Sequence, residues 1–421
     1  MLVLQLLDIL LMVLGTGALI YQVVYILVAL LAKPRVFPEA AKDQRFAVLV
    51  SARNEENVLP HLIASLRAND YPQNLIDIWV VADNCTDNTA QVVKNLGEHV
   101  IERSDSEHIG KGYALTFLLN KMMALGQASQ YDAFFVFDAD NFVEPNYFTE
   151  MNKVFQAGFP VVTSFRTASN FDQNWVSSGS GIWWLREMRF VNSSRMILGN
   201  SAQVGGTGFL FSQAVMRMND GWRFHLLTED AEFGLNCVLN GIRIGYCNSA
   251  ILYDEQPVRF SQSWQQRLRW SVGYLQVWRY YAGALVEHMV RERDLSALDF
   301  SLFLAPFTAM WFLRIIIGYV FAALGFITVS SQNQVLINWI IGLVGGMLLM
   351  MALAVLCCIL ERDKIPASNK ALLGYCLSFP VYFMSLVPIS ILALISKPQW
   401  KPIAHQGCQI VTASNSESEE A

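Results

Sequence analysis

Three short apolar runs in this sequence each end in acidic or amide side chains. The polar residues that follow the runs are Asn54 and Glu55, Asp83, and Asp138 and Asp140. Core packing does not require carboxylates at these positions, and like charges gathered at one place repel unless a cation or hydrogen-bond donors offset them. If the runs are neighbouring parallel strands, these groups converge on one sheet edge, where ligands bind.

Asp138 and Asp140 have the chemistry of a divalent-metal site. Carboxylate oxygens are hard ligands that suit Mg²⁺ or Mn²⁺, and diphosphate oxygens can complete the octahedron. An Asp-x-Asp sequence is also common in ordinary turns. The position directly after the buried run Phe134–Phe137 favours the metal site.

Lys111 lies between Gly110 and Gly112, just before a helical pattern. Glycines let the backbone approach a phosphate closely, and lysine supplies a point charge. The same three residues are typical of an ordinary surface turn, so the motif alone leaves both interpretations open.

Thr228, Glu229 and Asp230 precede a helical stretch, Ala231–Leu239. One interpretation is a helix start, with Thr228 as the cap and the acids complementing the helix dipole. The other makes Asp230 a general base that deprotonates an attacking hydroxyl.

The run Gln265–Trp270 follows in a region rich in tryptophan and arginine. An amphipathic helix at a membrane surface has the same composition. However, a Q-x-x-R-W sequence shortly after T-E-D is far rarer than either motif alone, which favours a shared role.

The elements that must position these residues alternate between strand and helix. Strands are expected at Phe46–Val50, Ile76–Ala82 and Phe134–Phe137, and helices at Glu56–Arg67 and Asp87–Leu96. This alternation predicts an α/β domain with a parallel, doubly wound sheet, which brings the strand ends together at one edge.

Composition places this domain between membrane segments. Of 421 residues, 53% are hydrophobic and 15% charged, and residues 1–32 contain a single charge, Asp8. The net charge of −5 without a dense basic patch argues against a nucleic-acid partner. Seven cysteines without a C-x-x-C sequence indicate neither a disulfide framework nor a zinc site.

Four apolar stretches are long enough to cross a bilayer as helices. They are Leu2–Ala32, Phe300–Val329, Val335–Leu360 and Leu372–Ile395. The first lacks a preceding Lys or Arg and is about twice the length of a signal-peptide core, so a retained anchor is favoured over a signal peptide. Lys33, Arg35 and the basic link after Leu360 place the middle domain in the cytosol.

We therefore predict a multi-pass protein of the plasma membrane. Its parts are an N-terminal transmembrane helix (1–32), a cytosolic domain (33–298), a C-terminal membrane region of about three helices (299–396), and a short polar tail, expected to be disordered (397–421). Residues 299–313 could instead form an interfacial or re-entrant piece. Within the cytosolic domain, residues 181–198 and 261–281 are candidate interfacial helices, and a core helix is the alternative for the first.

Taken in order, the motifs resemble the processive branch of family 2 glycosyltransferases, the cellulose, hyaluronan, chitin and poly-N-acetylglucosamine synthases. The matching series is A-R-N-E-E, D-N-C-T-D-N-T, G-K-G, D-A-D, G-G-T-G, T-E-D and Q-Q-R-L-R-W, between Ser51 and about Trp270. The resemblance implies a GT-A fold, which is Rossmann-like with a mostly parallel sheet, between transmembrane α-helices. The second motif departs from the usual D-D-x-S-x-D, so contacts to the nucleotide base can differ.

The resemblance also implies residue roles. Donor-binding residues would be Asn54, Glu55 and Asp83 near the base and ribose, with Lys111, Asp138, Gln266, Arg269 and Trp270 near the diphosphate and the transferred sugar. The metal ligands would be Asp138 and Asp140, with Asp140 in direct contact with Mg²⁺ or Mn²⁺. The catalytic group would be Asp230, together with Thr228 and Glu229, and the acceptor side would consist of Gly205, Gly206, Thr207 and Trp270.

The function implied is inverting transfer from a nucleotide sugar to a growing β-linked polysaccharide. UDP-glucose and UDP-N-acetylglucosamine are the favoured donors. The alternative is a single transfer to a membrane lipid, because ceramide glucosyltransferases resemble the same motif set. A carrier or channel without catalysis is disfavoured, since transport gives no reason to combine T-E-D with Q-x-x-R-W. Partner subunits are left open.

Overall fold

The structure, a computed structural model, describes residues 13, 17, 20–305 and 329–397. Its centre is an eight-stranded sheet in the order β3-β2-β1-β4-β7-β6-β8-β5. The strands are β1 Phe46–Ala52, β2 Ile76–Asp83, β3 His99–Arg103, β4 Ala133–Asp138, β5 Phe142–Val143, β6 Val161–Ala168, β7 Phe209–Ser212 and β8 Ile244–Asp254. Strands β3, β2, β1 and β4 are parallel, and β6 is parallel to β8. Strand β7 runs antiparallel between β4 and β6.

This topology confirms the predicted α/β class and the GT-A type of fold. The three predicted strands are present, and each extends one or two residues further toward its carboxyl end. As a result, Asp83 and Asp138 are the last residues of β2 and β4. The central strands are apolar on both faces, as expected for a sheet covered by helices on each side.

Helices cover the parallel half of the sheet. They are α2 Leu59–Arg67, α3 Thr89–Asn95, α4 Lys111–Ala124 and α5 Tyr147–Gln156, with short 3₁₀ turns at Gln73–Leu75 and Ala128–Gln130. The predicted helices at 56–67 and 87–96 are present but begin later than expected. Pro60 falls in the first turn of α2, where a missing backbone N–H costs nothing. Asp87 stays outside α3 because its side chain accepts from the Thr89 backbone N–H at 3.0 Å.

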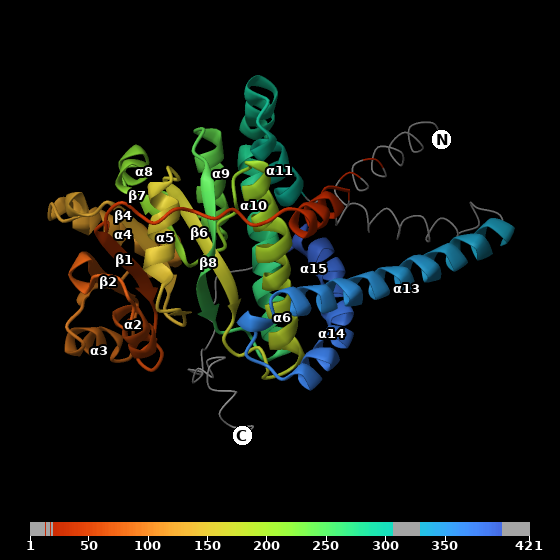
Figure 1. The fold of residues 1–421 in the computed structure, drawn as a ribbon, viewed down its shortest axis with the longest axis horizontal. Helices are drawn as coiled ribbons and strands as arrows, with labels where there is room; N and C mark the ends of the chain where they lie inside the picture. Colours follow the sequence, from red (N-terminus) through yellow and green to blue (C-terminus); the bar gives the residue numbers. More distant parts are fainter. Residues whose placement is uncertain (1–12, 14–16, 18–19, 306–328, 398–421) are drawn as a thin grey trace.

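The second half of the chain supplies the remaining helices, most of which lie away from α2 and α3 (Figure 1). They are α6 Trp175–Arg186, a π-helical turn Glu187–Asn192, α7 Ser193–Leu198, α8 Gln213–Met218, α9 Glu229–Leu239, α10 Phe260–Glu292, α11 Leu295–Leu304, α13 Val329–Leu360, a 3₁₀ turn Arg362–Lys364, α14 Asn369–Met384 and α15 Leu386–Ala393. The residues of the first predicted interfacial helix, 181–198, are largely buried, and Arg195 forms an ion pair with Asp299. Whether this segment also contacts lipid stays a prediction.

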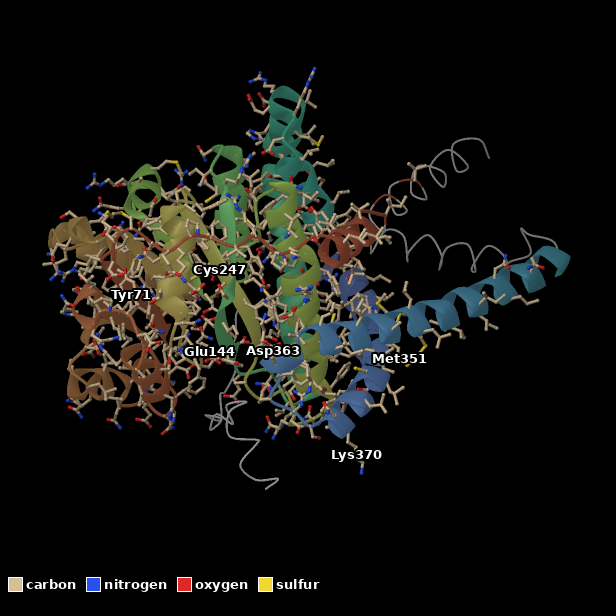
Figure 2. All side chains as sticks on the ribbon, viewed as in Figure 1. Tyr71, Glu144, Cys247, Met351, Asp363 and Lys370 are labelled. Atoms are coloured by element: carbon tan, nitrogen blue, oxygen red, sulfur yellow. The ribbon has the colours of Figure 1, made fainter. Side chains whose placement is uncertain are left out.

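Two helices in the described part of the chain are long and apolar enough to cross a membrane. They are Ile340–Leu360, with a mean hydropathy of 2.7, and Asn369–Ala393, with 1.9. Helix α13 extends away from the sheet, and Figure 2 shows Met351 along it and Lys370 near the start of α14. The predicted span 300–329 lies mostly outside the described residues, as do most of the predicted N-terminal span and nearly all of the tail.

Gly273 allows α10 to lie directly against the start of α9. A β-carbon placed on Gly273 would lie 2.5 Å from Cγ2 and 2.7 Å from Oγ1 of Thr228, so a larger residue cannot fit without movement. Thr228 is buried, and its short side chain cannot swing far to make room. This contact fixes the T-E-D motif to the helix that carries the Q-Q-R-L-R-W motif.

We expect Gly273→Ala to unfold at a lower temperature than Gly283→Ala, measured by thermal unfolding in detergent. Both substitutions add the same helix propensity to α10, about 1 kcal/mol. Gly283 faces open space, whereas Gly273 meets Thr228, where overpacking costs about 1–3 kcal/mol. Equal melting temperatures for the two variants would contradict the close contact.

Candidate active site

The loops after β1 and β2 are held to each other by their polar side chains. Asn54 has a positive φ of 59°, and its Oδ1 accepts from the Thr86 backbone N–H at 2.7 Å. The Glu55 N–H donates to Thr89 Oγ1 at 2.9 Å. These two motifs therefore form one structural unit at the carboxyl edge of the sheet, and Asn54 is part of its construction.

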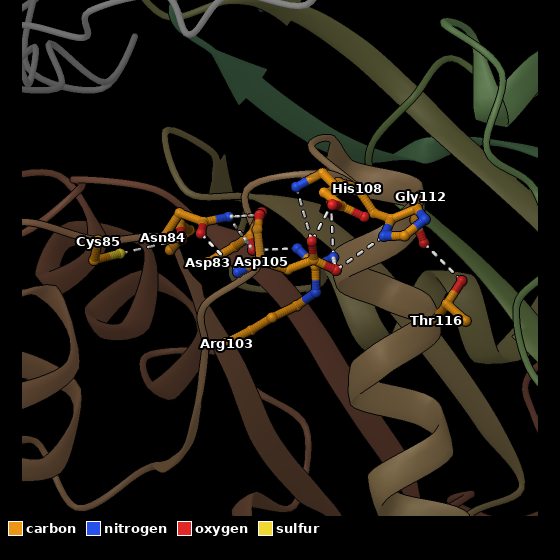
Figure 3. A network of polar contacts seen from close by, with 10 residues as sticks. Asp83, Asn84, Cys85, Arg103, Asp105, His108, Gly112 and Thr116 are labelled. Carbon is orange, nitrogen blue, oxygen red and sulfur yellow. Dashed lines mark hydrogen bonds and ion pairs between the residues drawn. The ribbon is translucent and has the colours of Figure 1, made fainter.

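Asp83 lies at the same edge and is already paired with a cation. It is 4% exposed, and its Oδ1 accepts from Arg103 at 2.5 Å. Arg103 also donates to Asp105 at 2.9 Å and to the His108 carbonyl at 2.7 Å (Figure 3). Burial raises the pKa of Asp83, and the Arg103 charge opposes that shift. A groove of about 550 Å³ adjoins this network and is lined by Asn84, Glu102–Glu107 and Phe117.

Lys111 begins α4 and connects two of the predicted motifs. Its Nζ donates to the Gly206 carbonyl at 2.8 Å and also forms an ion pair with Asp138. The neighbouring Gly112 must be glycine, because a β-carbon there would lie 2.1 Å from the Phe224 carbonyl oxygen. The structure thus brings together Lys111, Asp138 and the G-G-T-G segment, which are far apart in the sequence.

The turn after β4 is tied to the same segment from another side. The Asp138 N–H lies 2.9 Å from Asn141 Oδ1 and 3.0 Å from Thr207 Oγ1, and Thr207 also hydrogen-bonds to Asn141. Asp140 is 7% exposed, and Asn141 is buried. Sequence reasoning missed Asn141, although an amide directly after Asp-Ala-Asp was a signal.

Glu229 and Asp230 lie in the first turn of α9, and Asp230 faces this segment. A β-carbon on Gly206 would lie 3.5 Å from Asp230 Oδ2. Thr228 holds the N-cap position but makes no capping bond with its side chain, so the capping role expected of it under the helix-start interpretation is wrong. Its side chain lies instead against Gly273, where a β-carbon would come within 2.7 Å of Thr228 Oγ1.

The carboxyl groups of this turn are harder to ionise than ordinary ones. Burial raises the pKa of Glu229 to about 7, and the nearby Asp230 charge adds to the shift. Burial also raises the pKa of Asp230, whereas the charges of Lys111 and Arg166 lower it. The charge of Arg269 likewise lowers the pKa of Glu229. Nearby cations therefore offset the repulsion within the acidic cluster.

Helix α10 carries Gln266, Arg269 and Trp270 on neighbouring turns. Residues three and four positions apart share a face of a helix, so these three side chains point to one side of α10. The Trp270 ring lies 5.9 Å from the ring of Trp184 in an edge-to-face arrangement. Trp184 comes from α6 and also lies beside Gly205, 3.5 Å from the position of a β-carbon there.

The donor set at Asp138 and Asp140 fits a cation that is shared with a substrate. Within residues 13, 17, 20–305 and 329–397, no three His, Cys, Asp or Glu side chains cluster as a self-sufficient metal site. Mg²⁺ commonly takes one or two carboxylates and completes its shell with water and substrate phosphates. Two carboxylates at a strand end are compatible with this mode of coordination.

Comparison with known proteins shows the family. The family described as glycosyltransferase like family 2 matches residues 43–273, more than half of the chain. A β-monoglucosyldiacylglycerol synthase of Synechocystis is 26% identical over 55% of this chain, and a poly-β-1,6-N-acetyl-D-glucosamine synthase of Staphylococcus aureus is 24% identical over 53%. The chain spans about half the length of these relatives, 49% and 53%.

A solved structure shares the fold over nearly the whole chain. It is a mannosyltransferase from Pyrobaculum calidifontis, solved in complex with GDP-Man and Mn²⁺. It aligns with a TM-score of 0.57 at 14% identity and covers 91% of this chain and 97% of its own. At this identity the likeness extends to the fold alone.

Proposed function

Because this chain belongs to glycosyltransferase family 2, we propose that it transfers a sugar from a nucleotide-sugar donor to an acceptor at a membrane, with inversion at the anomeric carbon. One observation carries the proposal. Lys111, Asp138 and Asp230 surround the segment Gly205–Thr207, so a cation, an acid and a candidate base meet at one place.

On the donor side, Asp138 and Asp140 would hold the diphosphate through Mg²⁺ or Mn²⁺. Such an ion, when bound, neutralises charge on the leaving diphosphate. Lys111 and Arg269 would add positive charge where that leaving group develops it. UDP-glucose and UDP-N-acetylglucosamine remain the favoured donors. GDP-mannose is added as a further candidate because the structure of the mannosyltransferase was solved with GDP-Man.

On the acceptor side, Asp230 would take the proton of the attacking hydroxyl. The acceptor oxygen then bonds to the anomeric carbon as the bond from that carbon to the diphosphate breaks. A single displacement of this kind turns an α-linked donor into a β-linked product. Trp270 would offer an aromatic face to the acceptor, which orients a ring and buries its apolar side.

We propose a membrane lipid as the acceptor, ahead of the growing polysaccharide favoured by the motif series. A relative named for a glycolipid, monoglucosyldiacylglycerol, supports this choice. The two apolar helices α13 and α14–α15 would keep the enzyme at a bilayer. The polysaccharide remains a second candidate because the synthase from Staphylococcus aureus is named for a polymer.

The deciding experiment uses the purified chain in nanodiscs with Mg²⁺ or Mn²⁺. A panel of UDP-glucose, UDP-N-acetylglucosamine and GDP-mannose is tested with and without diacylglycerol, and nucleotide release and product size are measured. Release that depends on lipid, with one organic-soluble product, supports the lipid acceptor. A ladder of high-mass product would support the polysaccharide instead, and no release with any donor would oppose the proposed function.

Asp230→Asn should abolish transfer while nucleotide binding in the presence of metal survives. Loss of a general base typically costs 10²–10⁴-fold in rate, and the amide keeps the shape of the side chain. Transfer is measured by product formation and binding by isothermal titration calorimetry. A variant that retains turnover would remove Asp230 as the base.

Asp140→Ala should lose metal-dependent nucleotide binding, because it removes the carboxylate that we assign to the ion. The same titration with EDTA in place of metal should give equally weak binding to wild type and variant. Glu287→Gln is the control, since Glu287 forms an exposed ion pair with Arg291 near the far end of α10, away from Gln266–Trp270. Unchanged metal-dependent binding in Asp140→Ala would exclude Asp140 as a ligand.

The rate should fall as the pH is lowered. The midpoint of this fall should lie at a higher pH than for an enzyme whose base is an ordinary aspartate. The base works when ionised, and burial raises the pKa of Asp230, so protonation stops the reaction earlier as pH falls. Lys111→Met removes a charge that lowers this pKa, so the acid limb of kcat/KM should move to higher pH. Glu229→Gln removes a neighbouring negative charge and should move the limb to lower pH. Identical limbs in all three proteins would contradict this assignment.

A further inference from the structure

Arg166 on β6 belongs to none of the sequence motifs, yet it reaches the predicted acceptor wall. Its Nε donates to Asp254 Oδ2 at 2.9 Å, and its Nη2 completes the ion pair with the same oxygen. Its Nη1 donates to the Gly205 carbonyl at 2.6 Å. The side chains of Arg166 and Asp254 are only 12% and 4% exposed. One guanidinium therefore joins the end of β8 to the first residue of the G-G-T-G segment.

The same guanidinium lies over an aromatic ring. The central carbon of Arg166 is 3.9 Å from the centre of the Trp184 ring. Trp184 remains partly exposed, lies beside Gly205, and meets Trp270 edge-to-face at 5.9 Å. A cation over tryptophan gains energy only while it stays close to the ring, so Arg166 restricts where this ring can lie.

We propose that Arg166 is a positioning residue that holds Gly205 and Trp184 in place, so that Trp184 and Trp270 together form the acceptor subsite. This rests on the proposed function and adds to it a second aromatic residue and the group that fixes it. Two tryptophan rings at a steep angle offer one face and one edge to a bound molecule. They suit an acceptor with an apolar side next to its hydroxyl, such as the glycerol part of a diacylglycerol or a sugar ring.

A purely structural role for Arg166 would not account for all of its contacts. An arginine that only joined β6 to β8 would need Asp254, but neither the Gly205 carbonyl nor a partly exposed tryptophan. Arg166 also lies within electrostatic reach of both acidic groups. Its charge lowers the pKa of Asp230, and Asp138 and Asp140 act on Arg166 itself. The residue thus lies between the donor side and the acceptor side.

The test compares Arg166→Lys and Trp184→Ala with a matched control. Lysine keeps the charge for Asp254 but loses the planar fork that bonds Gly205 and covers Trp184. Arg45→Lys is the control, because Arg45 also pairs with an aspartate, Asp77 at 2.7 Å, and lies over a ring, Tyr131 at 5.6 Å. Arg45 lies before β1, at the opposite end of the sheet from the acidic cluster.

The readouts separate acceptor binding from donor binding and from folding. Transfer is measured against diacylglycerol in nanodiscs and against a soluble β-linked glucose oligosaccharide, and nucleotide binding is measured by calorimetry. We expect Arg166→Lys and Trp184→Ala each to raise the acceptor KM about tenfold or more, with nucleotide Kd unchanged. The double variant should be little worse than either single one, because both changes disrupt the same contact. Arg45→Lys should leave the acceptor KM unchanged.

Unchanged acceptor KM in both variants would overturn the inference while the proposed function stands. Equal losses of donor and acceptor binding would overturn it as well, since that pattern indicates general distortion. Trp184→Phe keeps an aromatic ring and should recover part of the acceptor KM, which a folding defect would not do. If wild type transfers sugar to neither probe, the proposed function fails, and this inference fails with it.

Discussion

Repulsion between carboxylates in a partly buried space is the constraint on which this site depends. Asp138 ends β4 and Asp140 follows it, and Asp230, next to Glu229 at the start of α9, lies beside Gly206. Carboxylates this close to one another cannot all stay ionised without cations near them. Lys111 pairs with Asp138, and the charges of Arg166 and Arg269 act on Asp230 and Glu229. A diphosphate entering this space brings further negative charge, which is the physical reason for proposing a divalent cation beside the aspartates.

The segment Gly205–Thr207 is where these compensating contacts meet. Each of its three residues accepts a hydrogen bond from a different partner. The Gly205 carbonyl accepts from Arg166, and the Gly206 carbonyl accepts from Lys111. The Thr207 hydroxyl accepts from the Asp138 backbone N–H. Gly206 has a φ of 84°, a conformation that favours glycine, and leaves room for Asp230 beside it. A short segment thus relates the proposed donor side, the proposed base and the aromatic pair to one another, because displacing it disturbs all three.

Much of this could be predicted from the sequence, and the missing part has a common cause. Apolar runs located β1, β2 and β4 and so placed Asp83 and Asp138 at the carboxyl edge of the sheet, because strand ends and their loops are local features. Arg166 was missed because its partners, Asp254 and Gly205, are 88 and 39 residues away and nothing near Arg166 marks it. Arg103 was missed because β3, half exposed and carrying charges, lacks the apolar pattern of the central strands. Thr228 was a plausible helix cap by type, yet close packing against α10 determines its position.

Helix α10 connects the aromatic pair to the apolar helices, and this connection is itself polar. Arg267, two residues before Arg269, is 3% exposed and donates to the Tyr382 carbonyl at 3.1 Å and to Ser385 Oγ at 2.7 Å. The Ser385 hydroxyl, at the break between α14 and α15, also donates to the Tyr382 carbonyl. The Tyr382 hydroxyl in turn forms a hydrogen bond with Ser180 at 2.6 Å, and Ser180 lies on α6, the helix that carries Trp184.

Both tryptophans of the proposed acceptor subsite therefore lie on helices fixed to α14. If α14 contacts the bilayer as its composition predicts, the distance from the bilayer to the acceptor subsite is set by buried hydrogen bonds, and an acceptor that stays in the bilayer meets the base at a constant depth.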